Sequence, residues 1–228
     1  INQIVKTAVE TVGPQVVGTE VRLAEVDIQL SAGRGDLKGL SVANPAGYQK
    51  PYAFSLGEIA LDIDPASLTK EVIVIDEILI SGAQLVAEYK DGKNNNLQNL
   101  LDNMQGGSAS SSDSAAETSP AEASGKVLLA VRKFTFEGTR IDVITPKWGE
   151  RQVMLPAIRL SDLGSASRGL TPEQLAQKVV KQLLEQAKGA VTDDLKALAK
   201  EKAKAKLKEK LGADVSAKLE GLKSLFKR

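Results

Sequence analysis

The run Val72-Ile73-Val74-Ile75 constrains the fold most, because a strand of consecutive β-branched residues is apolar on both of its faces. A related segment follows 56 residues later, when Gly82 is aligned with Gly138. A repeated unit usually buries its apolar face against the next copy, so we predict a sheet of about one and a half related units. The alignment matches Ile78 with Phe134, Ile80 with Phe136, Leu85 with Ile141, and Asp76-Glu77 with Arg132-Lys133.

The second apolar face of this strand needs a cover, and the sequence leaves two interpretations open. A continuous apolar run is typical of a strand buried between two layers, and the amphipathic segment 172–187 is available as the second layer. The alternative is that one face meets the acyl chains of a lipid. On that hypothesis the lipid-facing candidates have the same parity in both copies: Val72, Val74, Ile78, Ile80, Leu128, Ala130, Phe134 and Phe136.

The chain has no cysteine and no histidine. Their absence excludes zinc sites built on these residues, thiol nucleophiles and Ser-His-Asp triads. The carboxylate pairs Asp62/Asp64 and Asp193-Asp194 lie at a strand-ending turn and near a helix start, where acidic residues are common for structural reasons. We therefore predict a protein that is not an enzyme and that has no cofactor or metal site.

The net charge of +1 hides an asymmetry along the chain. From residue 188 onward there are 12 basic and 6 acidic residues, whereas the preceding part has 18 basic and 23 acidic residues. The lysines of the tail have no aromatic residues between them and arginine is scarce there, so we do not expect a nucleic-acid partner.

The N-terminal residues 1–14 predict a helix that ends at Gly13-Pro14. Its apolar stripe is already in progress at Ile1, so we expect a signal or a membrane anchor upstream of this chain. In the strands that follow, the apolar residues change parity between Leu56 and Ile59, and again between Leu155 and Ile158. A change of parity without a change of face predicts a β-bulge, near Gly57-Glu58 in the first case and at Pro156 in the second.

A segment rich in serine, alanine and glycine interrupts the β-rich part of the chain. It has almost nothing to bury, so we predict a disordered linker over residues 105–125. The predicted organisation is therefore a helix over 1–14, a first β unit with a short helix over 15–104, the linker 105–125, a second partial β unit over 126–164, and a basic helical region over 170–228.

The C-terminal region predicts three successive helical segments. Thr171 and Pro172 start an amphipathic helix over 172–187, whose residues Leu175, Val179 and Leu183 are candidates for a lid or docking face. A lysine-rich helix follows over 193–211, and Gly212 is expected to break it before a short final helix. The tail is interpreted either as a solvated helix or as a membrane-surface element, with the candidates Lys218, Leu222, Lys223, Phe226, Lys227 and Arg228.

The first 104 residues, and more weakly residues 126–163, resemble the AsmA-like proteins of Gram-negative envelopes. The resemblance rests on the order of six motifs: G-T-x-V, V-x-I-x-L, G-x-L-x-G-L-x-I-x-N-P, F-x-L-x-x-I-x-x-x-x-D, I-x-I-D-x-I-x-I-x-G and N-L-x-x-L-L. They fall, with some departures in the individual letters, on residues 18–21, 26–30, 35–45, 54–62, 73–82 and 96–101.

The resemblance implies a periplasmic protein that is anchored to the inner membrane and handles phospholipid along a curved sheet. We accordingly expect an α+β fold, with a strongly curved, mainly antiparallel sheet that forms a trough or partial barrel, an N-terminal helix and C-terminal helices. The expected function is lipid binding or transport in envelope maintenance. The alternative is an envelope scaffold with a fully packed sheet, which self-associates or docks to a partner protein through its C-terminal helices.

Overall fold

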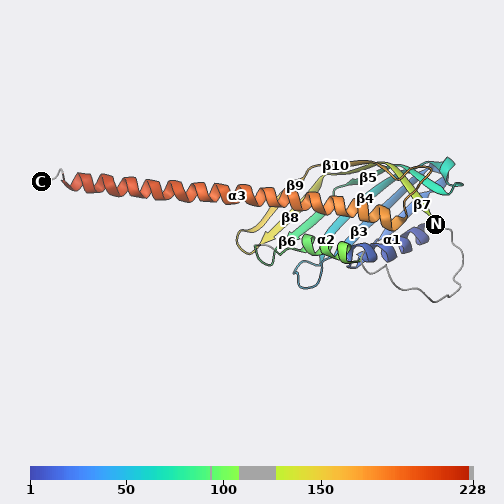
Figure 1. The fold of residues 1–228 in the computed structure, drawn as a ribbon, viewed down its shortest axis with the longest axis horizontal. Coiled ribbons are helices and arrows are strands. Elements are labelled where there is room, and N and C mark those ends of the chain that lie inside the picture. Colours follow the sequence, from blue (N-terminus) through green and yellow to red (C-terminus); the bar gives the residue numbers. More distant parts are fainter. Residues whose placement is uncertain (93, 108–126, 226–228) are drawn as a thin grey trace. The chain divides into compact units, whose positions relative to one another are not determined.

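The computed structural model describes residues 1–92, 94–107 and 127–225, with only the backbone described for 105–107 and 212–225. It divides into two compact units, residues 1–190 and residues 191 onward (Figure 1). The elements in chain order are α1 (Asn2–Val17), β1 (Val21–Arg22), β2 (Glu25–Gln29), the 3-10 turn η1 (Leu30–Ala32), β3 (Arg34–Ala43), β4 (Tyr52–Ile63), the 3-10 turn η2 (Pro65–Ser67), β5 (Val72–Ser81), β6 (Gln84–Glu88), α2 (Asn96–Gly107), β7 (Leu128–Glu137), β8 (Thr139–Thr145), β9 (Gly149–Leu155), β10 (Ile158–Leu163) and α3 (Pro172–Leu225).

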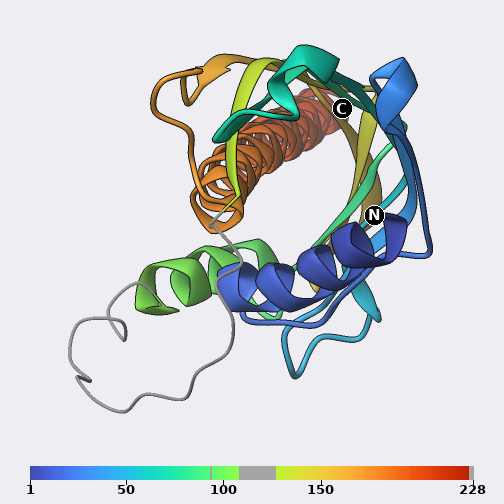
Figure 2. The same ribbon diagram turned by 90° about the vertical axis from the view of Figure 1, so that its right-hand side faces the viewer.

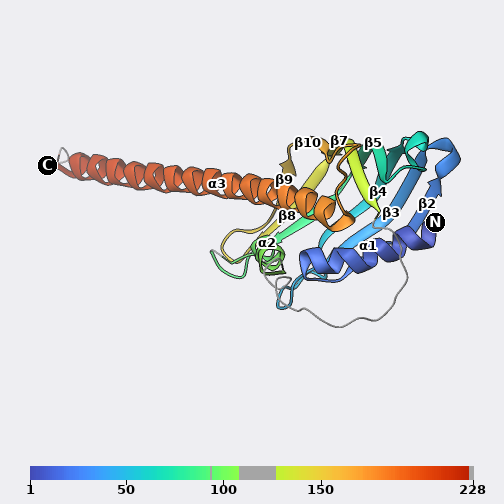
Figure 3. The same cartoon turned by 45° about the vertical axis from the view of Figure 1, so that its right-hand side comes forward.

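The ten strands form one open sheet in the first unit. In one half of the sheet the order is β10, β7, β5, β4, β3 and β2 (Figure 3), and in the other half it is β9, β8, β6, β4, β3 and β1. All pairings are antiparallel except β5–β7 and β6–β8, which are parallel. Viewed end-on, the sheet is a curved wall with helices on its concave side (Figure 2). The predicted α+β class and the curved, mainly antiparallel sheet are therefore confirmed.

The two copies of the repeat lie side by side in the register that the sequence alignment predicts. Val72 pairs with Leu128 and Ser81 with Glu137 in the β5–β7 ladder, and the same offset continues from Gln84 paired with Arg140. The copies are thus neighbouring parallel strands of one sheet. Parallel neighbours require a crossover connection, which here runs from Tyr89 to Val127 and includes α2.

A line of glycines crosses the sheet where the strands change parity. Gly39 of β3 lies opposite Gly57 of β4, and the line continues through the breaks between β5 and β6, between β7 and β8, and between β9 and β10. The residues at these breaks are Gly82, Gly138 and Pro156. Gly39, Gly82 and Gly138 have φ of 65, 66 and 65°, which favours glycine because it has no Cβ. We call this line the crease.

The crease replaces the β-bulge that the sequence predicted at Gly57-Glu58. The β3–β4 ladder keeps one register across this point, with Leu40 opposite Leu56 and Lys38 opposite Glu58. Both strands change parity together, so no residue is left over. The same face of the sheet is apolar on both sides of the crease. The ring of Phe54 on one side stacks on the ring of Phe136 on the other, with 6.2 Å between their centroids. Pro156 follows β9, which pairs with β8, and precedes β10, which pairs with β7.

The alternation of side chains between the two faces of the sheet changes a second time, at Asp76 in β5, Arg132 in β7 and Asp162 in β10. The pairings omit these three residues, and Asp162 has a φ of 56°. In β4 the residues Ile59, Leu61 and Ile63 alternate regularly, and they pair with Ile80, Ile78 and Ile75. Residues 75, 78 and 80 therefore share the concave face although their spacing is odd.

Helix α1 covers the edge of the sheet at β1 and β2. Its residues Asn2, Lys6 and Glu10 recur every fourth position, so they lie along one side of the helix. Asn2 Oδ1 accepts from Ile28 N at 3.1 Å, Lys6 Nζ donates to Ala24 O at 3.1 Å, and Glu10 Oε1 accepts from Leu23 N at 3.0 Å. Side chains of the helix thus satisfy backbone groups that an exposed edge strand would leave open to pairing with another chain.

The predicted end of this first helix at Gly13-Pro14 is wrong. The helix continues to Val17, with Pro14 inside it and Gly18 as a left-handed C-cap. Proline costs one intrahelical hydrogen bond. Val16 and Val17, which are only 3% and 4% exposed, gain enough burial in the last turn to offset that loss.

Helix α3 is a single helix where the sequence predicted three. Thr171 caps it as predicted: Thr171 Oγ1 accepts from Gln174 N, and Gln174 Oε1 accepts from Thr171 N. The helix continues through Gly189 and Gly212 to Leu225, so the predicted break at Gly212 is wrong. A single glycine costs only about 1 kcal/mol in a helix, and the surrounding alanine, leucine, lysine and glutamate are all strong helix formers.

Candidate functional site

An apolar cavity of about 180 Å³ lies between the concave face of the sheet and the three helices of the first unit. Among the residues that the structure describes, only apolar ones line it. They come from α1, β1, β3, β4, β6, α2 and the start of α3: Val9, Gly13, Val16, Val17, Val21, Leu40, Val42, Ala53, Phe54, Leu85, Leu97, Leu100, Ala176, Val180, Leu183 and Leu184.

The first turns of α3 form one wall of this cavity. Its lining residues Ala176, Val180, Leu183 and Leu184 have the spacing of one helical face, and Leu184 is buried. Lys188 Nζ donates to Gln98 Oε1 of α2, which ties the two helices together beside the cavity. In Figure 2 this part of α3 lies inside the curve of the sheet.

Helix α2 is fixed to the sheet by the fully buried side chain of Asn96. Its Nδ2 donates to Val86 O and to Asn44 Oδ1, both at 2.7 Å, and its Oδ1 accepts from Glu88 N at 2.9 Å. One amide thus joins β6, the β3–β4 loop and α2. It holds the next apolar residues of the helix, Leu97 and Leu100, at the cavity wall.

Phenylalanine rings stiffen the sheet side of the cavity. Phe54 lines the cavity, and Phe136, which is 1% exposed, stacks on it across the crease. Beyond the cavity the concave face stays apolar but is less covered, since Ile59, Leu61 and Ile78 are only half-buried. An apolar surface therefore continues from the cavity along the trough.

In the part of the chain that the structure describes, no charged or hydrogen-bonding side chain lines the cavity. The two tyrosines whose pKa is raised by burial, Tyr48 and Tyr89, lie elsewhere, in the β3–β4 loop and directly after β6. An apolar wall can hold a hydrocarbon by burial and packing, but it offers nothing for proton transfer or nucleophilic attack.

Residues 34–154, more than half of the chain, match the model of the AsmA family. The chain belongs to the AsmA family. Membership indicates an envelope-related protein of Gram-negative bacteria, and the AsmA family is generally not a family of enzymes. No curated protein and no solved structure matches the chain. In the part of the AsmA-family chain that the structure describes, no helix is long and apolar enough to cross a membrane.

The structure of this AsmA-family chain divides the eight lipid-facing candidates between the two faces of the sheet. Ile80 pairs with Phe136 and Ile78 with Phe134, and the contact of Phe136 with Phe54 places this group on the concave face. The other four precede the second change of parity and lie on the opposite face: Val72, Val74, Leu128 and Ala130.

The opposite face at these four residues is covered by the chain itself. Val72 and Leu128 lie against Gly169, whose Cβ, if it had one, would come within 3.0 Å of Val72 Cγ1 and 2.6 Å of Leu128 Cβ. Ser67 of η2 accepts a hydrogen bond from Val74 N at 2.9 Å. The outer face of the run 72–75 is therefore packed against other parts of the chain, whereas on the concave face Ile75 is buried and Ile73 is half-buried.

The three lid candidates of α3 have different environments. Leu183 lines the cavity, whereas Leu175 and Val179 are half-buried and outside its lining. Among the membrane-surface candidates, Lys218, Leu222 and Lys223 lie in the part of α3 for which only the backbone is described. Phe226, Lys227 and Arg228 lie outside the described residues.

The candidates omitted the contributions of α1 and α2 to the cavity. Val9, Val16 and Val17 of α1, with Leu97 and Leu100 of α2, line it. Their spacing, i, i+7 and i+8 in α1 and i, i+3 in α2, is visible in the sequence as two apolar helix faces. What the sequence lacks is a signal that both faces turn to the same side of one sheet.

Proposed function

We propose that this protein is a non-enzymatic lipid-binding protein of the periplasm that holds the acyl chain of a phospholipid in the cavity and along the trough. Anchoring to the inner membrane through a segment outside this chain is part of the proposal. The single observation that carries it is the apolar cavity between sheet and helices, which continues into half-buried apolar surface. Family membership supports the envelope setting.

The size of the cavity fits part of an acyl chain. An apolar cavity of about 150 Å³ takes up benzene, and the volume here is about 180 Å³. Each methylene group transferred from water to such a site contributes about 0.8 kcal/mol. We therefore assign the end of a chain to the cavity and the rest to the concave surface around Ile59, Leu61 and Ile78.

A cavity-filling substitution tests this function. Ala176 lies in the wall formed by α3, and Ala176→Phe should occupy the space of the ligand. Ala199→Phe is the matched control, because residue 199 belongs to the same helix and is exposed. We expect phospholipid to co-purify with the wild type and with Ala199→Phe, at about one molecule per protein or less, and to be strongly reduced in Ala176→Phe. Solvent extraction followed by mass spectrometry measures it.

Two outcomes would count against lipid binding. One is a wild-type protein that carries no phospholipid and takes up no brominated lipid under conditions where it is folded. The other is equal retention of lipid by Ala176→Phe and Ala199→Phe. Either result would favour the alternative of a packed scaffold.

A second function, docking through α3, is favoured by a specific observation in the second unit. All residues from 201 to 211 are exposed, including Leu207 at 60% and Leu211 at 57%. The two leucines are four residues apart and so lie on the same side of the helix, among lysines. Such a face fits self-association or an envelope protein partner.

The double variant Leu207→Gln/Leu211→Gln tests this second function. We expect it to lower the oligomer fraction seen by light scattering, or the retention of a partner, without loss of helix content. Lys206→Gln/Lys210→Gln on the same stretch separates the charge from the leucines. A separate assay with anionic liposomes tests the membrane-surface role proposed for the tail residues 218–228.

A further inference from the structure

All three tyrosines and the only tryptophan of the chain lie at one end of the sheet. Tyr48 is in the β3–β4 loop, Tyr52 starts β4, Tyr89 follows β6, and Trp148 is in the β8–β9 turn. These positions are far apart in the sequence. The chain has three tyrosines and one tryptophan in all, so its polar aromatic residues are confined to this end.

The strand pairings bring the three connections together. Tyr52 pairs with Ala43 at the end of β3, and Tyr89 N donates to Ile144 O at the end of β8 at 2.9 Å. The β8–β9 turn is closed next to this point, where Trp148 N donates to Thr145 Oγ1 at 3.1 Å. The loops 44–51 and 89–95 and the turn 145–149 are therefore neighbours along one edge.

Lysines accompany the aromatic rings. Lys90 Nζ lies 4.3 Å from the ring centroid of Tyr48, and Lys147 Nζ lies 5.1 Å from the ring centroid of Trp148. Lys50 is also exposed at this end. We call the seven residues together the aromatic end: Tyr48, Lys50, Tyr52, Tyr89, Lys90, Lys147 and Trp148.

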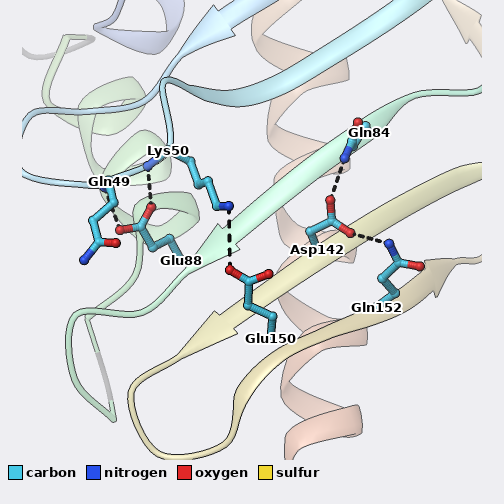
Figure 4. Close-up of polar contacts among 7 residues, drawn as sticks. All are labelled: Gln49, Lys50, Gln84, Glu88, Asp142, Glu150 and Gln152. Carbon is cyan, nitrogen blue, oxygen red and sulfur yellow. Dashed lines mark hydrogen bonds and ion pairs between the residues drawn. The ribbon is translucent and has the colours of Figure 1, made fainter.

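The loop that carries Tyr48 is held rigidly. The carboxylate of Glu88, which is 6% exposed, accepts from Gln49 N at 2.7 Å and from Lys50 N at 3.0 Å. Lys50 Nζ lies 3.6 Å from Glu150 Oε1, which joins the loop to the start of β9 (Figure 4). Beside it, Asp142 bridges Gln84 and Gln152 across β6, β8 and β9. The aromatic end is thus a preformed surface.

The chemistry of this surface matches the interface of a bilayer. Tyrosine and tryptophan combine an apolar ring with a polar tip, and they are enriched where membrane proteins meet the headgroup layer. Lysines close to the surface of an anionic leaflet strengthen binding by electrostatic attraction.

We propose that the aromatic end docks onto the headgroup region of a phospholipid bilayer that contains anionic lipid. The rings of Trp148 and Tyr52 enter the headgroup layer, and Lys50, Lys90 and Lys147 face the lipid phosphates. This contact is separate from the apolar cavity, whose lining contains none of the seven residues. It stands whether or not the cavity takes up an acyl chain.

Trp148 provides a direct test, because as the only tryptophan it reports on this end alone. The full chain is mixed with vesicles of phosphatidylcholine containing phosphatidylglycerol. We expect the emission of Trp148 to shift to shorter wavelength and to be quenched when the vesicle lipids are brominated. Co-sedimentation without quenching would place the membrane contact elsewhere and overturn the proposal, as would a failure to bind anionic vesicles. The same shift with soluble glycerophosphoglycerol but not with vesicles would overturn it as well.

Lysine-to-glutamine variants provide a second test of docking by the aromatic end. Lys90→Gln/Lys147→Gln should weaken vesicle binding by about fivefold for each lysine. Lys70→Gln is the matched control, since Lys70 is exposed in the turn between η2 and β5, at the other end of β4. Its binding should stay within twofold of the wild type. An equal loss in both variants would mean nonspecific attraction and would contradict docking by the aromatic end.

Discussion

Lys133 Nζ lies 2.7 Å from Glu77 Oε1 across the parallel β5–β7 pair, and Arg132 contacts Asp76 one position earlier. The two acidic residues belong to the first copy of the repeat and the two basic residues to the second. Opposite charges at equivalent positions of two similar strands favour the pairing of one copy with the other. Two copies of the first type would place like charges side by side, which is destabilising.

Reversing one charge should therefore weaken the sheet, and exchanging both should restore it. The side chains of Lys133 and Glu77 are 58% and 37% exposed, so the pair contributes no more than about 1 kcal/mol. We expect Glu77→Lys to lower the free energy of unfolding by about 1 kcal/mol, and Glu77→Lys/Lys133→Glu to recover most of it. Urea denaturation of the four members of this double-mutant cycle measures the coupling. Additive effects would show that the pair does not interact.

The two facing glycines of the crease, Gly39 and Gly57, should differ in how well they tolerate a side chain. Gly39 has a φ of 65°, and a Cβ there would come 2.7 Å from Ala24 Cβ. Gly57 lies opposite and has open space around it. Because both strain and overlap act at residue 39, we expect Gly39→Ala to lower the free energy of unfolding by about 2 kcal/mol or more, and Gly57→Ala by less than about 1 kcal/mol. Thermal and urea unfolding of the two variants compare them directly, and similar losses would contradict the role assigned to the crease.

The register of the central strands was predictable from sequence, but their direction was not. Aligning Gly82 with Gly138 reproduces the pairing of Ile78 with Phe134 and Ile80 with Phe136. The alignment alone does not say that the copies are neighbours, because parallel pairing depends on where the crossover through α2 goes. Loop and helix placement of this kind depends on contacts far apart in the sequence, such as that of Asn96 with Asn44.

The candidate site was only partly predictable for a related reason. Regular alternation along a strand assigns every second residue to the same face of the sheet. This rule correctly groups Ile78 with Ile80, but it assigns the residues before Asp76 to the wrong face, because the β5–β7 pairing omits one residue in each strand at that point. A non-glycine residue that breaks the alternation leaves no clear mark in a sequence. Glycine does, and for this reason the change of parity near Gly57 could be recognised whereas the one at Asp76 could not.

Asn96 should be the polar side chain on which the position of α2 depends most. Asn96→Ala leaves the buried Glu88 N and Val86 O without a partner and removes the bond to Asn44. A buried group without a partner costs about 1–3 kcal/mol, so we expect the free energy of unfolding to fall by about 3 kcal/mol. Asn94→Ala, in the exposed turn before α2, is the control and should cost less than about 1 kcal/mol. A loss for Asn96→Ala as small as that of the control would contradict the role of this network.

Stability at high pH should depend on Tyr89. Burial raises the pKa of its hydroxyl above the ordinary 10.0, so the folded state keeps a proton that the unfolded chain releases first. This contribution to stability is complete below about pH 10 and is lost as the pH rises through the folded pKa.

We expect Tyr89→Phe to lose less free energy of unfolding than the wild type between about pH 9 and about pH 11. Tyr52→Phe, at the exposed start of β4, controls for loss of a hydroxyl. Urea denaturation at each pH gives the slopes, and identical slopes for wild type and Tyr89→Phe would contradict the assignment. Because the pKa of Tyr48 is raised too, mainly by burial, Tyr48→Phe/Tyr89→Phe should flatten the profile further.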